Sequence, residues 1–77
     1  MDYQKYRDLV KQEIKPYVEV YSVTESELDD FISREERIIK ERFGMCLEAI
    51  EKGEMTIEQM KYGSVGSTAY CLAMLFE

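Results

Sequence analysis

The 77-residue chain has no histidine, and this absence removes the side chain that most often serves as a general base near neutral pH. A carboxylate, lysine, tyrosine or cysteine would need a strongly shifted pKa to replace it, and so short a chain has little volume for the necessary pocket. Cysteine is scarce as well: Cys46 and Cys71 form no CxxC pair, and no residues have the spacing of zinc ligands. We therefore expect a protein that is not an enzyme and holds neither metal nor cofactor.

The two cysteines also bear on the cellular compartment. Both stand in apolar surroundings, where a thiol is inert, and no signal-peptide pattern precedes the first helical segment. We interpret Cys46 and Cys71 as reduced, buried thiols of a cytoplasmic protein. An oxidising compartment would allow one disulfide between them.

Long apolar runs and an excess of basic charge are both missing. The most apolar stretch, residues 69–76, is far shorter than the roughly 20 residues that a membrane-spanning helix needs. Ten basic residues against sixteen acidic ones give a net charge of −6, opposite in sign to most proteins that bind nucleic acid directly. These features exclude a membrane anchor and direct nucleic-acid binding, and they favour another protein as the partner.

The apolar residues that are present recur with the period of a helix. Between residues 2 and 21 they follow one another at spacings of three and four, which places them on one stripe of a helix. This stripe consists of Tyr3, Tyr6, Val10, Ile14, Tyr17 and Tyr21. Pro16 lacks a backbone donor and crowds the preceding turn, so we expect a kink or a break near Lys15. The stripe continues in phase beyond Pro16, which favours the kink.

A capping box opens the second helical segment. In VTESEL, Thr24 can cap a helix while Glu27 reaches back to the backbone of the cap. Apolar residues then hold helical phase as far as Gly53, which can take the left-handed conformation that ends a helix. We predict one long helix over this span, with a bend at Gly44 as the alternative.

A second capping box, MTIEQM, predicts a short helix that starts after Thr56 and ends at Gly63. Ser64 or Ser67 can then cap a last helix. That helix, residues 68–76, is apolar on nearly every side, and such a helix is normally buried. We expect it to close the core, or to complete the core across a dimer axis.

These segments predict an all-α fold, a small bundle of about four helices that forms a single domain over residues 1–77. Only YVEVYSV alternates with the two-residue period of a half-buried strand. So small a domain buries only about 60–65% of the surface that its unfolded chain exposes, and its stability margin is thin. A second subunit or another partner is therefore expected.

Two opposite charges fall on the apolar face of the long predicted helix. On a wheel of 100° per residue, Glu35 and Arg42 lie within that face, about 10.5 Å apart along the axis. In an antiparallel pair of identical helices, Glu35 of one chain could meet Arg42 of the other and set the register of a homodimer. The alternative is that both side chains extend past a small core into water.

Four of the six tyrosines, Tyr3, Tyr6, Tyr17 and Tyr21, lie on the stripe of the first helix. Tyrosine combines a large apolar ring with one hydrogen-bonding tip, so it suits both the margin of a thin core and an interface with another chain. The sequence leaves both interpretations open.

The run ESELDD places Glu25, Glu27, Asp29 and Asp30 in the first turns of the second segment, with no basic residue among them. Carboxylates at this end of a helix are favoured by the helix dipole. A cluster of carboxylates could also imitate nucleic acid and occupy the basic channel of a nuclease.

From these features we expect a small non-enzymatic regulator, adaptor or inhibitor that binds another protein stoichiometrically through a helical surface. The alternative is an acidic inhibitor that mimics nucleic acid, the strategy of many small phage-encoded anti-restriction and anti-CRISPR proteins. Salt distinguishes the two, because binding through charge mimicry weakens steeply as ionic strength rises, whereas an aromatic interface responds little.

Overall fold

The computed structural model describes residues 1–76, and helices account for most of that range. The elements are α1 (Tyr3–Val18), the 3₁₀ turn η1 (Glu19–Tyr21), α2 (Glu25–Arg34), α3 (Glu36–Glu51), α4 (Ile57–Gln59), the π-helical segment η2 (Met60–Ser64) and α5 (Val65–Leu75). The described residues include no strand. The predicted all-α bundle is therefore confirmed.

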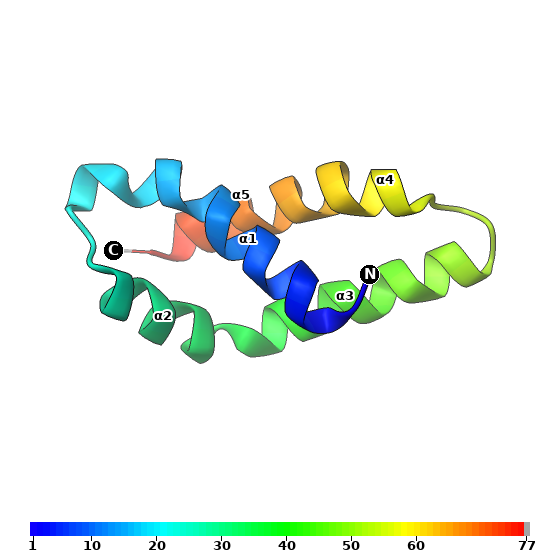
Figure 1. Ribbon diagram of the computed structural model, residues 1–77, viewed down its shortest axis with the longest axis horizontal. Helices are drawn as coiled ribbons and strands as arrows, with labels where there is room; N and C mark the ends of the chain where they lie inside the picture. The colour runs from blue at the N-terminus through cyan, green and yellow to red at the C-terminus, as the bar shows by residue number, and fades with distance from the viewer. Residues whose placement is uncertain (77) are drawn as a thin grey trace.

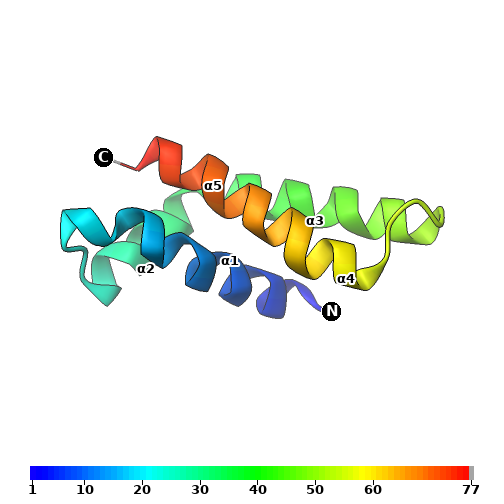
Figure 2. The ribbon, with the colours of Figure 1, turned by 90° about the horizontal axis from the view of Figure 1, so that it is seen from above.

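The helices form three long stretches in an elongated molecule of 40 × 18 × 18 Å. The stretch α2–α3 is followed by the stretch α4–η2–α5, and these two run side by side as a hairpin (Figure 1). The first helix, α1, lies across one side of that hairpin and packs mainly against α5. Figure 2 shows that the end of the hairpin formed by α3 and α4 extends beyond α1.

α1 has the amphipathic pattern that the sequence predicts, with one shift. Asp2 caps its start, and its buried residues repeat every four positions: Tyr6, Val10, Ile14 and Val18. Because that repeat leads to Val18, Tyr17 falls outside the core. The helix continues through Pro16 as far as Val18, so the chain does not break near Lys15. The kink at Pro16 stays a prediction.

The capping box at Thr24 is present, but the long helix that follows it is divided at Glu35 rather than bent at Gly44. Glu35 has φ −100° and ψ 15°, whereas Gly44 lies inside α3. Contacts from α1 hold the chain at this point: Glu36 accepts a hydrogen bond from the Tyr3 hydroxyl (3.1 Å) and pairs with Arg7 (3.8 Å). Such tertiary contacts leave no local signal in the sequence.

The capping box at Thr56 is also present, yet the helix that it starts does not end at Gly63. The chain stays helical through η2 into α5, and Ser64 has helical dihedral angles and makes no cap hydrogen bond. The expected turn and the cap by Ser64 or Ser67 are therefore wrong. Glycine in a helix costs about 1 kcal/mol relative to alanine. Burial of Met60 and Val65 on either side offsets that cost.

The core gathers apolar side chains from all three stretches. It consists of Tyr6, Val10, Ile14, Val18, Leu28, Phe31, Ile32, Ile39, Cys46, Met60, Val65, Ala69 and Leu72. α5 supplies the last three and packs on α1, but its opposite side is uncovered, with Tyr70 and Met74 exposed. α5 is thus buried on one side only in the single chain, because three helical stretches are too few to surround one of them. Completion of the core across a dimer axis stays a prediction.

Candidate functional site

The four tyrosines of the predicted stripe divide between two environments. Tyr3 is partly buried and Tyr6 fully buried, and both rings pack on Phe43, with centroid distances of 5.6 and 5.3 Å. Tyr17 and Tyr21 are exposed at the other end of the helix. The first two tyrosines thus belong to the core and its margin, and only the second two lie on a surface that a partner can reach.

The hydroxyl of Tyr6 joins a buried polar cluster that the sequence analysis missed. It is hydrogen-bonded to Ser64 Oγ (2.8 Å) and Thr68 Oγ1 (3.1 Å), and the Cys46 thiol donates to Ser64 Oγ (2.9 Å). The cluster links α1, α3, η2 and α5, and no buried side-chain nitrogen or oxygen in the described residues lacks a partner. The sequence does contain a signal for this cluster. Met60, Ser64, Thr68 and Leu72 repeat every four residues, which places two hydroxyl groups on an otherwise apolar stripe.

An exposed set of aromatic and apolar side chains lies where α1 and η1 adjoin α5. We call this set the tyrosine face: Tyr17 (48% exposed), Val20 (82%), Tyr21 (54%), Tyr70 (54%) and Met74 (68%). The rings of Tyr17 and Tyr70 meet edge to face with centroids 5.8 Å apart. Tyr21 packs on Phe76, which in turn packs on buried Phe31. Sequence analysis assigned two members of this face and missed the other three.

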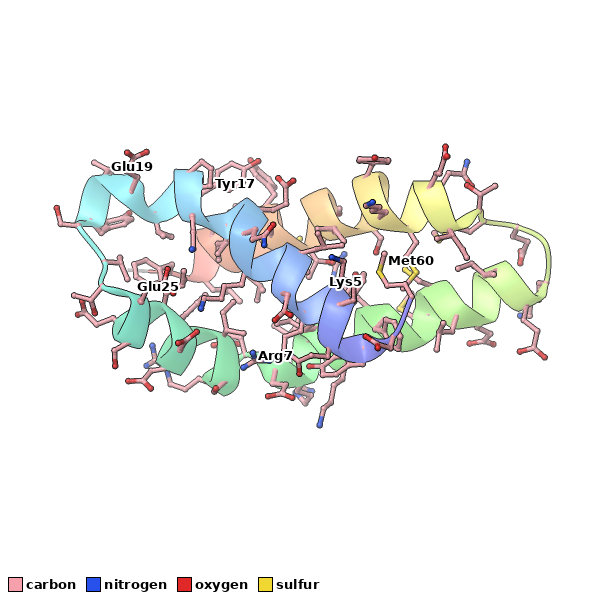
Figure 3. All side chains as sticks on the ribbon, viewed as in Figure 1. Lys5, Arg7, Tyr17, Glu19, Glu25 and Met60 are labelled. Atoms are coloured by element: carbon pink, nitrogen blue, oxygen red, sulfur yellow. The ribbon has the colours of Figure 1, made fainter. Side chains whose placement is uncertain are left out.

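Charge is segregated around α1. Three of its four basic residues, Arg7, Lys11 and Lys15, pair with carboxylates of α2 or α3, whereas Lys5 lies at an exposed position. Figure 3 shows Arg7 on the side of α1 toward α3 and Tyr17 on the side away from it. The whole segment 62–76, which includes α5, has no charged residue. The α5 part of the tyrosine face therefore carries no charge, whereas its α1 and η1 part includes the exposed Glu19. The side of α1 toward α2 and α3 is bound by ion pairs.

The predicted acidic patch is largely used within the chain. Lys11 pairs with Glu25 (2.8 Å) and Asp29 (2.5 Å), and Lys15 pairs with Glu25 (2.7 Å). Hydrogen bonds from Lys11 and Lys15 lower the pKa of Glu25 to about 2. Glu27 serves the capping box, and the hydrogen bond from the Thr24 amide lowers its pKa.

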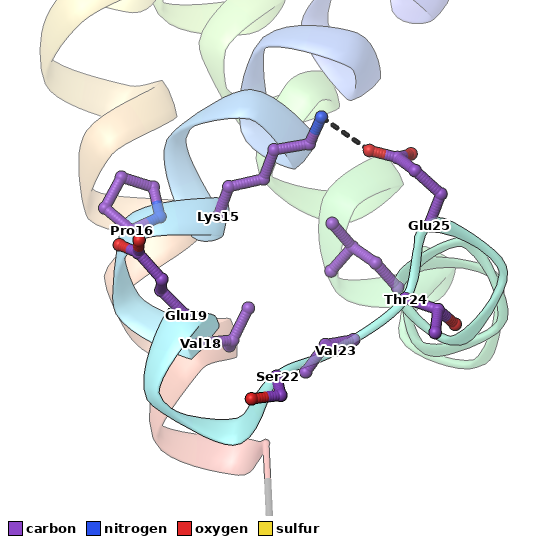
Figure 4. A pocket seen from close by; sticks show the side chains of 9 residues that line it. Lys15, Pro16, Val18, Glu19, Ser22, Val23, Thr24 and Glu25 are labelled. Atoms are coloured by element: carbon purple, nitrogen blue, oxygen red, sulfur yellow. Dashed lines mark ion pairs between the residues drawn. The ribbon is translucent and has the colours of Figure 1, made fainter.

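Of the four carboxylates, only Asp30 forms no hydrogen bond or ion pair with another described residue. The ion pair between Lys15 and Glu25 also borders a cavity of about 480 Å³ between the end of α1 and the start of α2 (Figure 4). Lysines of α1 thus neutralise an acidic patch that has no basic residue within its own segment of the sequence.

Glu35 and Arg42 are not brought together. The wheel on which both were placed assumed one straight helix, and the interruption at Glu35 removes that premise. Arg42 is partly buried, and its Nη2 donates to the sulfur of Cys71 on α5 (3.4 Å). Its guanidinium is therefore directed toward α5. The register pair in a homodimer stays a prediction.

A groove of about 590 Å³ lies between α3 and the stretch that contains α5. It is lined by Ile38, Glu41, Arg42, Met45, Cys46, Ala49, Met55, Ser64 and Cys71. Phe43 faces α1, so the groove opens on a different side of α3. We call it the α3–α5 groove.

Both cysteines line the α3–α5 groove as free thiols, Cys46 buried and Cys71 partly exposed. Full burial was expected for both, which is wrong for Cys71. Cys46 contacts Ser64, and Cys71 lies seven residues further along the helical stretch, about 10.5 Å at 1.5 Å per residue. A disulfide needs Cα atoms within about 7 Å, so this arrangement does not favour one.

Two further chemical possibilities find no support in the part of the chain that the structure describes. Residues 1–76 contain no group of three or more side chains able to hold a metal ion. None of the helices described has both the length and the apolar character needed to cross a bilayer. No protein-family model, curated protein or solved structure matches the chain.

Proposed function

We propose that this protein is a small, non-enzymatic regulator, adaptor or inhibitor that binds another protein through the tyrosine face. The observation that carries the proposal is the edge-to-face pair of Tyr17 and Tyr70, two rings from different helices that are each about half exposed. Large exposed apolar patches on soluble proteins commonly mark interaction sites. Tyrosine and methionine are also enriched at protein interfaces.

The face has the properties of an interface core rather than those of a solubilising surface. Tyr17 and Tyr70 support each other edge to face, and Phe76 connects Tyr21 to buried Phe31. Rings held in this way lose little conformational entropy when a partner covers them. Binding energy at interfaces is concentrated in such aromatic anchors.

A nucleic-acid mimic is less well supported. Lys11 and Lys15 pair with Glu25 and Asp29, two of the four carboxylates of the predicted acidic patch, so that patch has fewer charges available to replace phosphates. Changing those two residues to amides would also remove ion pairs within the fold. Asp30→Asn is the cleaner probe of mimicry, because Asp30 has no such pair with a described residue.

The first experiment identifies the partner by crosslinking it from defined positions of the tyrosine face. A photo-crosslinking benzoylphenylalanine is introduced at Tyr17 or Tyr70 in cells, and at Leu47, an exposed apolar residue of α3, as the control. We expect one protein to be captured from the first two positions and not from the third. Capture from all three positions alike would contradict a defined face.

The second experiment measures affinity with the purified partner. Tyr17→Ala and Tyr70→Ala should each weaken binding by about tenfold or more, since anchors of this kind contribute about 2 kcal/mol. Leu47→Ala should change the dissociation constant less than about twofold. The affinity should change little between about 50 and about 500 mM salt. Steep salt dependence together with a loss on Asp30→Asn would instead support the acidic mimic.

A further inference from the structure

The α3–α5 groove differs from the tyrosine face in having a cation among apolar walls. Arg42 is its one basic lining residue, and in the described chain no carboxylate forms an ion pair with it. Its hydrogen-bond partner is the sulfur of Cys71, a weak acceptor. A guanidinium has five N–H donors in a planar fork that suits a carboxylate. The groove thus holds a cation whose preferred partner has not been supplied by the fold.

The walls of the groove are apolar and adaptable. Its apolar lining includes Ile38, Met45 and Ala49 from α3 and Met55 from the segment before α4. Methionine side chains are flexible and fill irregular spaces, so they can follow the shape of an aliphatic chain. From Arg42 to Ala49 the groove extends along seven residues of helix, about 10.5 Å. An extended chain of roughly eight to ten carbons spans that length.

The size of the groove favours a small molecule over a protein. Its volume of about 590 Å³ falls in the range of about 300–1,000 Å³ typical of small-molecule sites. A stable protein interface needs about 800 Å² from each partner, which is more than a cavity of this kind offers.

Two further cavities lack this combination of features. In the cavity beside α2, Lys15 is already paired with Glu25. The third, about 680 Å³, is lined by Glu27, Asp30, Ser33 and Arg34 with Phe76 as its one aromatic residue. Arg34 there stacks on the ring of Phe31.

We propose that the α3–α5 groove binds a single-chain amphiphile with one carboxylate head, such as a medium-chain fatty acid. The carboxylate accepts two hydrogen bonds from Arg42 in place of the weak bond to Cys71, and the aliphatic chain lies along Met45, Ala49 and Met55. Glu41, the other charged residue of the lining, carries a negative charge close to the head. It therefore favours a monoanionic carboxylate over a dianionic phosphate. This site is independent of the tyrosine face.

The test compares three ligands of one chain length on the wild-type protein, by calorimetry below their micelle concentrations. Decanoate should bind at one site per chain, at least about tenfold more tightly than decanol or decyl phosphate. Each methylene group removed from decanoate should weaken binding about fourfold, from about 0.8 kcal/mol per buried group. Equal affinities for decanoate and decanol would overturn the role of Arg42. Tighter binding of decyl phosphate would overturn the carboxylate assignment, and no saturable binding would overturn the site.

Location is tested by the thiol of Cys71, which lines the groove and is partly exposed. Saturating decanoate should slow its alkylation by a maleimide at least about fivefold, since the carboxylate head bound to Arg42 occupies the space beside the Cys71 sulfur. Arg42→Gln should weaken the binding of decanoate at least about tenfold and leave the affinity for decanol unchanged. Arg37→Gln, at an exposed position of α3, should leave both affinities unchanged. Unaltered alkylation would place the ligand elsewhere and overturn the proposal. A dimer by light scattering that decanoate does not dissociate, with Cys71 protected, would show that a second copy fills the groove and would overturn it too.

Discussion

The two ends of α1 carry tyrosines in opposite situations. At its start, Tyr3 and Tyr6 donate or accept hydrogen bonds and pack on Phe43. At its end and in the η1 turn that follows, Tyr17 and Tyr21 are half exposed and contact other aromatic rings. All four lie on one stripe of the sequence. Their difference shows that residue type and spacing locate a face but do not decide which of its members the fold covers.

The physical basis of the difference is the geometry of a thin bundle. A stripe with spacings of three and four keeps one angle on a helix of 3.6 residues per turn, whereas the core follows a repeat of four that rotates by about 40° at each step and ends at Val18. The hairpin lies beneath the start of α1, where Ser64 and Thr68 offer hydroxyl partners to Tyr6. Beyond Pro16, Tyr17 contacts the ring of Tyr70 and stays about half exposed. The start of α1 therefore supports the fold, and we assign its end to binding.

The largest expected effect is on the stability of the buried end. Tyr6→Ala should lower the free energy of unfolding by about 3–5 kcal/mol, because it removes a fully buried ring and leaves a cavity. Tyr17→Ala, the matched change at the exposed end, should cost less than about 1 kcal/mol. Urea denaturation followed by circular dichroism measures both values. Equal losses for the two variants would remove the distinction between the ends of α1.

A smaller effect is expected when only the hydroxyl of Tyr6 is removed. Tyr6→Phe keeps the ring but leaves Ser64 and Thr68 without their shared partner, so the free energy of unfolding should fall by about 1–3 kcal/mol. Tyr70→Phe, at an exposed position of the tyrosine face, should change it by less than about 0.5 kcal/mol. The same denaturation series reports both. A neutral Tyr6→Phe would mean that the polar cluster contributes nothing to stability.

Much of the fold could be predicted from the sequence, because local signals are strong where they concern single helices. The capping boxes at Thr24 and Thr56 are present as expected, and the helical period gave the correct fold class. The wrong predictions concern helix boundaries that depend on tertiary contacts. The break at Glu35 is held by contacts between Glu36 and α1, and the helix continues through Gly63 because Met60 and Val65, on either side of it, are buried.

The candidate sites were harder to predict for the same reason. The acidic patch contains no base in its own segment, and only folding brings Lys11 and Lys15 to it. Ser64 was assigned as a cap because a glycine-rich stretch precedes an apolar helix, whereas the four-residue spacing to Thr68 points to the core. The α3–α5 groove joins residues about 30 positions apart, Arg42 and Cys71, which no local pattern relates.

The partly buried tyrosine at the start of α1 should make the protein sensitive to alkali. Burial and the hydrogen bond to Glu36 raise the pKa of Tyr3 from 10.0 to about 12. The protonated hydroxyl is thus favoured in the folded state, so its contribution is complete below pH 10 and is lost as the pH rises toward 12. Denaturation at a series of pH values should show that Tyr3→Phe loses less stability than the wild type over this interval. Tyr62→Phe, at an exposed position, should behave as the wild type does; parallel curves for all three proteins would contradict the assignment.

The ion pairs opposite the tyrosine face should give the smallest effect, since they are solvent-exposed and screened by salt. Hydrogen bonds from Lys11 and Lys15 lower the pKa of Glu25 from 4.5 to about 2. The folded state therefore favours the ionised carboxylate, and its contribution is complete above pH 4.5 and lost as the pH falls toward 2. Glu25→Gln should be slightly less stable than the wild type at pH 6, with the difference closing by pH 2, whereas Asp30→Asn should show no such trend. If the stability difference between Glu25→Gln and the wild type persists at pH 2, packing rather than charge holds α2 against α1. The ion pairs would then not distinguish this side of α1 from the tyrosine face.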